Sequence, residues 1–142
     1  MMEFDGIDCT SVIREHPSGV AFMMSLEDLT PSQLYISQGK LNAVQEWLDI
    51  GNLYEIDPIP VKRLGDRIVM MDGHTRAVAT HLAGLVAIPV YWDEDELDMC
   101  AYGICVDWCK SEGILSPIDL ASRVVSHEDY QHLWLKRCAE IF

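Results

Sequence analysis

The chain has 142 residues, of which 49% are hydrophobic and 23% charged, and its formal net charge is −13 at pH 7. This length and apolar content suit one folded domain with its own core and exclude an intrinsically disordered chain. The excess of acid argues against a protein whose main task is to grip a phosphate backbone, because that task needs clustered Lys and Arg. One small phosphate ligand needs only a local positive field and stays compatible with this charge.

No apolar run approaches the roughly 18 residues of a membrane helix, and Met1–Asp5 lack the basic and apolar regions of a signal peptide. We therefore expect a cytoplasmic protein without a membrane partner. The five cysteines contain no C-x-x-C pair, so their spacing gives no support to a zinc site and favours small buried thiols. The oligomeric state is left open, and a homo-oligomer is compatible with the sequence.

The first half of the chain mixes strand and helix signals. Val20–Met24 is typical of a strand, and Thr30-Pro31-Ser32 marks a turn or helix start. A helix is predicted after this turn because apolar residues then recur at helical spacing, at Leu41, Val44, Trp47 and Leu48.

A hairpin is the clearest local prediction. Residues 57–63 look like a strand that carries prolines, so we expect one of its edges to be unpaired. Gly65-Asp66 is a two-residue turn, and Ile68–Met71 is a return strand buried on both faces. A helix over residues 76–83 that ends at Gly84 and a strand over residues 86–92 complete the pattern.

The character of the chain changes after Trp92. One helical face is predicted from Leu97 to Trp108, and Ser116-Pro117 and Ser126 are helix starts. We therefore predict a single α/β domain over residues 1–142, with a small mixed sheet in a core at 20–92 and a helical extension at 93–142. Two histidines of the extension, His127 and His132, are five residues apart and not four, so they do not form the H-E-x-x-H zinc motif.

One stretch has the character of a site, namely Asp72-Gly73-His74-Thr75-Arg76. It lies between a predicted buried strand and a predicted helix start, where unpaired backbone N–H groups and the helix dipole favour a phosphate or a carboxylate. Gly allows close backbone approach, Arg offers a bidentate clamp, Thr a hydroxyl, and Asp and His serve a metal or a proton. The alternative is a plain strand–helix turn in which Asp72 caps the helix.

Four features of the chain, taken in order, resemble the ParB/sulfiredoxin superfamily. They are the proline-marked strand, the hairpin, the D-G-H-x-R loop and the Ile-Pro-Val strand. The resemblance covers residues 54–92, and Leu26–Leu48 is similar to the opening segment of that superfamily. It implies a ParB/sulfiredoxin-like fold in which the loop cradles nucleotide phosphates. The phosphate-binding candidates are then Gly73, His74, Thr75 and Arg76, with Asp72 or His74 near Mg²⁺ and ATP, ADP or CTP as the nucleotide.

The individual activities of the superfamily transfer less well. Sulfiredoxin needs a cysteine in the loop, where this chain has His74. The free-serine kinases carry a glutamate where this chain has Gln33, and glutamine cannot act as a general base. Either Glu27 or Asp28 serves instead, or no phosphoryl is transferred. The sequence therefore names no catalytic residue, and it favours a nucleotide or another phosphate-bearing small molecule as the partner.

Two other functions stay open. A non-catalytic interaction module is suggested by the aromatic residues Trp92, Trp108, Tyr130 and Trp134, although their helical spacing favours the core. DNA binding or cleavage, as in ParB-like nucleases, would need a basic surface that the composition makes scarce. Its only obvious candidates are Lys62, Arg63 and Arg67.

Overall fold

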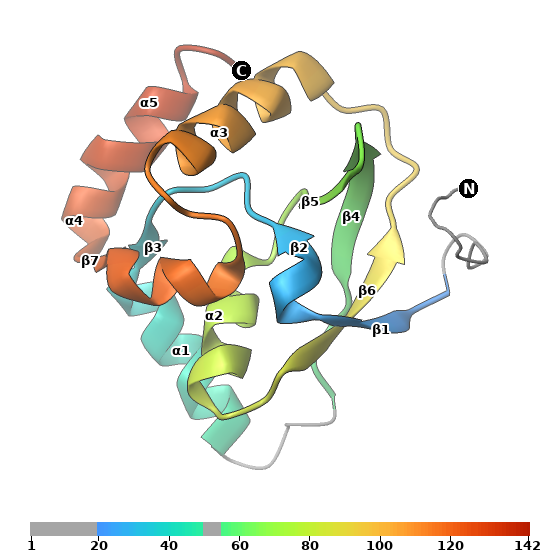
Figure 1. Cartoon of the computed structure of the whole chain (residues 1–142). Coiled ribbons are helices and arrows are strands. Elements are labelled where there is room, and N and C mark those ends of the chain that lie inside the picture. Colours follow the sequence, from blue (N-terminus) through green and yellow to red (C-terminus); the bar gives the residue numbers. More distant parts are fainter. Residues whose placement is uncertain (1–19, 50–54) are drawn as a thin grey trace.

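A computed structural model describes residues 20–49 and 55–142 of the chain (Figure 1). The predicted mixed α/β class is confirmed. The strands are β1 (Phe22–Ser25), β2 (Leu29–Thr30), β3 (Ile36–Ser37), β4 (Ile59–Leu64), β5 (Arg67–Met70), β6 (Ala87–Trp92) and β7 (Val124–Val125). The helical elements are η1 (Leu26–Asp28), α1 (Gln38–Asp49), α2 (His74–Leu82), α3 (Met99–Ser111), η2 (Pro117–Arg123), α4 (His127–Tyr130), η3 (Gln131–Leu135) and α5 (Lys136–Cys138).

Five strands form a mixed sheet in the order β1-β6-β4-β5-β2. The β1–β6 and β4–β5 pairs are antiparallel, and the β4–β6 and β2–β5 pairs are parallel. The predicted hairpin is confirmed: Leu64 pairs with Arg67 across the two-residue turn. Gly65 in that turn has φ +64°, which glycine adopts without strain.

The prediction that the proline-bearing strand has an unpaired edge is wrong. Strand β4 is the central strand and pairs with β6 on one side and with β5 on the other. Pro60 is tolerated because it sits just beyond the last β4–β5 pair, where its carbonyl accepts the Met71 N–H at 2.9 Å. A residue with an N–H at position 60 would donate it to the Met71 carbonyl, but Pro60 has none. The Met71 carbonyl instead accepts the Tyr102 hydroxyl of α3 at 3.2 Å.

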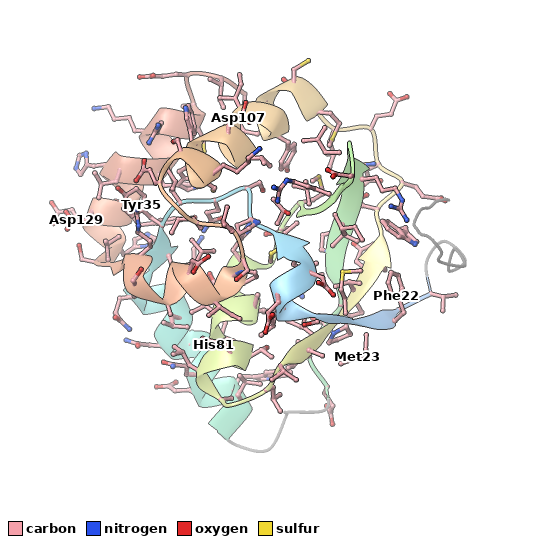
Figure 2. The ribbon with its side chains drawn as sticks, in the orientation of Figure 1. Phe22, Met23, Tyr35, His81, Asp107 and Asp129 are labelled. Carbon is pink, nitrogen blue, oxygen red and sulfur yellow. The ribbon has the colours of Figure 1, made fainter. Side chains whose placement is uncertain are left out.

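Strand β1 is the first strand of the described chain and forms one edge of the sheet. Its side chains alternate as a strand requires: Phe22 packs against Trp92 with ring centroids 5.7 Å apart, whereas Met23 is 63% exposed (Figure 2). The predicted first strand is thus confirmed, shifted slightly toward the C-terminus.

Helix α2 lies between the sheet and α1 (Figure 1). Ala77 belongs to the apolar cluster that the sheet forms with η1. Val78 and Ala79 belong to the second cluster, which joins α1 and α3 to the C-terminal helices. Because α2 is packed on both sides, the start of this helix is fixed in space by both halves of the core.

Residues 93–142 pack onto the core. The predicted start at Ser116 is confirmed as a complete capping box that opens the 3-10 helix η2, and the Ser126 hydroxyl accepts the Asp129 N–H and caps α4. Strand β7 pairs in parallel with β3, so Val124 lies opposite Ile36. Tyr130 and Trp134 are 5% and 4% exposed and complete the cluster that contains Val78.

The structure places several other residues that the sequence singled out. Among the described residues, no helix is long and apolar enough to cross a membrane, and no three His, Cys, Asp or Glu side chains gather as metal ligands. Cys105 and Cys109 are buried free thiols, as predicted, and burial raises the pKa of each to about 12. His127 bonds Ser37 through Nδ1 at 2.9 Å, and His132 is exposed.

The Tyr102→Phe variant tests the bond that compensates for Pro60. Removing the hydroxyl leaves the Met71 carbonyl without its donor and should lower the free energy of unfolding by about 1 kcal/mol. Urea unfolding measures this change. Tyr91→Phe is the control, because the Tyr91 hydroxyl makes no hydrogen bond to another described residue, and an equal loss in both variants would contradict this account.

Candidate functional site

The Asp72–Arg76 loop joins the end of β5 to the start of α2. Gly73 is the N-cap residue of α2, with φ +81°, and no side chain caps the helix. Asp72 is not the cap that the plain-turn alternative supposes, because its Oδ1 accepts the Gly73 N–H at 2.8 Å. The first-turn N–H groups of α2, which have no intrahelical acceptor, therefore have no side-chain partner among the described residues.

Gly73 is required by the packing of the loop itself. A Cβ atom at this position would lie 2.8 Å from Cγ1 of Ile59 and 2.9 Å from Nη2 of Arg76. The positive φ adds a second reason for glycine, since L side chains rarely adopt it. The sequence motif thus marks a close contact between the loop and β4, whatever ligand the loop receives.

His74 is fully enclosed. Its Nε2 accepts the Ser32 N–H at 3.0 Å, so the neutral ring carries its proton on Nδ1. That Nδ1 is buried and has no hydrogen-bond partner among the described residues. Burial lowers the pKa of His74 to about 4, although the Asp72 charge opposes the shift. At neutral pH the loop therefore holds an uncharged ring with one unused donor.

Arg76 is anchored rather than free. Its Nη1 donates to the Asp57 carbonyl at 2.8 Å and to the Pro58 carbonyl at 3.4 Å. These bonds hold the guanidinium over the segment that leads into β4. Because both acceptors are neutral carbonyls, the bonds do not neutralise the positive charge of Arg76. The backbone carbonyl of Arg76 accepts the Thr80 hydroxyl at 2.8 Å, and the Thr75 hydroxyl has no partner among the described residues.

The loop faces a groove with a volume of about 400 Å³. All five loop residues line it, together with residues of the β2–β3 connection, α1 and α4, namely Gln33, Lys40, Ala43, Val44 and Tyr130. The Lys40 ammonium lies 5.1 Å from the centroid of the Tyr130 ring. The groove therefore joins the loop to a second cation, which comes from α1, and to an aromatic wall, which comes from the helical extension.

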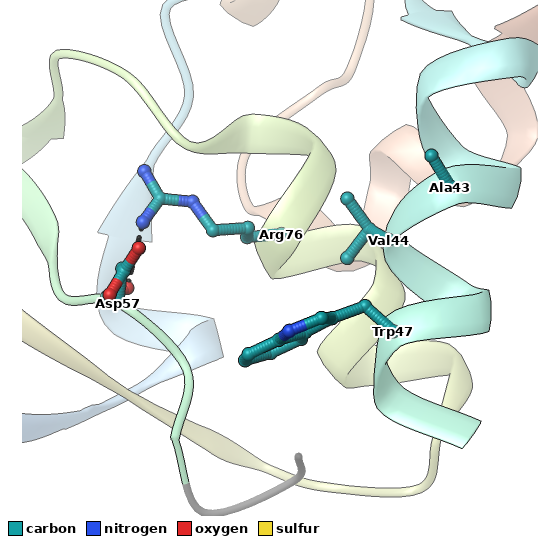
Figure 3. Close-up of a pocket in the computed structure, with 5 residues that line it drawn as sticks. All are labelled: Ala43, Val44, Trp47, Asp57 and Arg76. Carbon is teal, nitrogen blue, oxygen red and sulfur yellow. Dashed lines mark hydrogen bonds between the residues drawn. The ribbon is translucent and has the colours of Figure 1, made fainter. Parts of the chain in front are cut away.

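A second cavity of about 240 Å³ adjoins the first (Figure 3). The two cavities share Ala43, Val44 and Arg76, and the second one adds Trp47 and Asp57. Figure 3 shows the Trp47 indole projecting from α1 below the side chains of Val44 and Arg76, and the Arg76 side chain reaching across to Asp57.

Sequence reasoning missed Lys40 and Trp47 as groove residues. It assigned Trp47 to the apolar core face of the helix, but this side chain is 38% exposed, whereas Leu41 and Leu48 are buried. The available signal was a second stripe on α1, because positions 40, 43, 44 and 47 repeat at i, i+3, i+4 and i+7. Tyr130 carried no such signal, since only the fold brings the extension to the loop.

Asp72 is the one carboxylate among the described residues that line the larger cavity. Glu27 and Asp28, the acids considered as a replacement base, are exposed on η1 and do not line it, whereas Gln33 does. A magnesium ion here would have Asp72 as its protein ligand and would depend on phosphate oxygens and water for the rest, which is common for Mg²⁺.

Comparison with known proteins identifies no family. No family model matches the chain, and no curated protein matches it. Among solved structures, the chain is similar to the crystal structure of protein Atu1540 from Agrobacterium tumefaciens, with a TM-score of 0.47 and 13% sequence identity. The match covers 69% of this chain and 51% of the Atu1540 chain, so this chain spans about half the length of that protein.

The Gly73→Ala variant tests the packing of the loop. Gly113→Ala is its matched control, because Gly113 also has a positive φ, +78°, but no atom lies within 4 Å of its Cβ position. The control should lose about 1–2 kcal/mol of unfolding free energy from backbone strain alone. Gly73→Ala should lose roughly a further 1–3 kcal/mol from overpacking against Ile59. Equal losses in thermal or urea unfolding would contradict the close contact.

The buried His74 predicts an acid-sensitive fold. Its pKa of about 4 lies below the ordinary 6.5, so the native state binds fewer protons than the unfolded state between these values. The contribution of His74 to the free energy of unfolding is complete above pH 6.5. It declines as the pH falls toward 4, by about 3 kcal/mol in all. Urea midpoints measured between pH 7.5 and 4 check this slope.

His74→Gln is the matched variant, because the glutamine oxygen can replace Nε2 as the acceptor for Ser32 without titrating. The acid slope should become shallower in this variant and stay unchanged in His132→Gln, whose side chain is exposed. An unchanged slope in His74→Gln would assign the acid sensitivity to other groups.

Proposed function

We propose that the protein binds a nucleotide, with its phosphates at the start of α2. The observation that carries this proposal is the start of α2, which lies on one wall of a groove and whose first N–H groups have no side-chain partner among the described residues. No side chain caps α2, and the buried Nδ1 of His74 has no partner among the described residues. An uncapped helix start with a positive dipole is a ready site for an anionic oxygen.

Charge and size support a phosphate ligand in particular. Lys40 and Arg76 bring positive charge from two helices to one groove of about 400 Å³, so the local field can attract an anion in spite of the net charge of −13. The resemblance of residues 54–92 to the ParB/sulfiredoxin superfamily supports the same ligand. Gly73, Thr75 and Arg76 would surround the phosphates, and Mg²⁺ at Asp72 would offset the repulsion between this carboxylate and a phosphate.

We propose nucleotide binding as the function, because phosphoryl transfer has less support. Transfer to a hydroxyl needs a positioned base. Among the described residues, the larger cavity offers only Asp72, which the proposed magnesium ion would occupy, and the weakly basic His74. Bound ATP, ADP or CTP would then act as an effector, unless a second substrate supplied the general base for the transfer.

The two alternatives have less support. The open groove beside the loop favours a small ligand over an interaction module, and Trp134 and Tyr130 are buried in the core. DNA binding at the hairpin would compete with existing contacts, because Lys62 donates to the Asp93 carbonyl at 2.8 Å and Arg63 lies over the Trp92 ring.

Calorimetric titration with ATP, ADP and CTP in the presence of Mg²⁺ tests the proposal. At least one nucleotide should bind, and Lys40→Ala should weaken its binding roughly fivefold to tenfold through the loss of one charge-assisted contact. Lys110→Ala, at an exposed position near the end of α3, is the control and should bind like the wild type. The absence of binding to wild type at millimolar nucleotide would end the proposal.

A further inference from the structure

One face of α1 lines both cavities. Lys40, Val44 and Trp47 lie on this face at positions i, i+4 and i+7, and seven residues of helix span about 10 Å. The cavities share Val44 and Arg76, so they form one elongated groove beside α1. Its two ends differ in chemistry, which gives any ligand an orientation.

The end at Trp47 suits a flat apolar ring. The indole is 38% exposed and lies beside the Val44 methyl groups, with the aliphatic part of Arg76 across the cavity (Figure 3). Aromatic and aliphatic surfaces that face each other across a narrow space bind planar rings by stacking and by exclusion of water. The cavity volume of about 240 Å³ suits a ring system rather than a peptide or a lipid chain.

Asp57 gives this end a polar preference. Its backbone carbonyl already accepts from Arg76, and Asp57 is an exposed residue that lines the cavity. A carboxylate accepts hydrogen bonds and donates none, so it favours an amino group and repels a phosphate. The anionic part of a ligand is thereby directed to the other end, at Lys40 and the start of α2.

From this arrangement we infer that the cavity at Trp47 binds the base of the nucleotide and prefers a base with an exocyclic amino group. The base stacks on Trp47, and its amino group donates to the Asp57 carboxylate. The inference rests on the proposed phosphate site and adds the specificity of that site. Adenine and cytosine carry the required amino group, whereas hypoxanthine and uracil carry a carbonyl in its place.

Titration with ATP, ITP and inorganic tripolyphosphate, each with Mg²⁺, separates the base from the phosphates. In the wild type, ATP should bind roughly tenfold tighter than tripolyphosphate and several-fold tighter than ITP. Trp47→Leu should reduce ATP to the affinity of tripolyphosphate while leaving tripolyphosphate binding unchanged, which also shows that the variant is folded. Ile104→Ala, at another exposed apolar position on a helix, is the control and should change neither affinity.

Asp57→Asn should narrow or reverse the preference of ATP over ITP, because the amide can donate to the carbonyl of hypoxanthine. If ATP, ITP and tripolyphosphate bind alike and Trp47→Leu changes nothing, the base site is wrong while the phosphate site stands. If wild type binds neither tripolyphosphate nor ATP, the proposed function fails and the base site fails with it.

Discussion

Ser32 makes two buried bonds on which the geometry of the groove depends. Its N–H donates to Nε2 of His74 at 3.0 Å, and its hydroxyl donates to the Met70 carbonyl at 2.6 Å. The two bonds tie the β2–β3 connection to the last residue of β5 and the first residue of α2. The first of these bonds also selects the His74 tautomer and favours the neutral ring, since a buried imidazolium could not accept the Ser32 N–H.

The groove is assembled from segments that are far apart in the chain. Helix α1 contributes Lys40 and Trp47, the loop contributes the start of α2, and the extension contributes Tyr130. Both cations among the described residues that line it lie against other groups, Lys40 over the Tyr130 ring and Arg76 on two backbone carbonyls. Such anchoring reduces the side-chain entropy that binding would otherwise cost.

Local signals predicted much of the fold, and tertiary context decided the rest. The Gly65-Asp66 hairpin and the Ser116 capping box are encoded within a few residues, so the sequence was sufficient for both. The pairing of β4 was mispredicted because the compensating donor, Tyr102, lies on a distant helix. The loop was recognised by its composition. Lys40 and Trp47, on the solvent-facing side of α1, were missed because the apolar residues of this helix indicate only a buried face. Which of its two faces a helix buries depends on neighbours that periodicity alone does not name.

The parallel pairing of β3 with β7 has a consequence for the order in which the molecule is built. Ile36 meets Val124, and Ser37 meets Val125, so the entry to α1 is secured by residues near the other end of the chain. During synthesis, the loop and α1 leave the ribosome well before β7 and Tyr130. The groove is therefore completed only when residues 124–130 are available, and a shorter chain carries the D-G-H-T-R sequence without the Tyr130 wall of the groove.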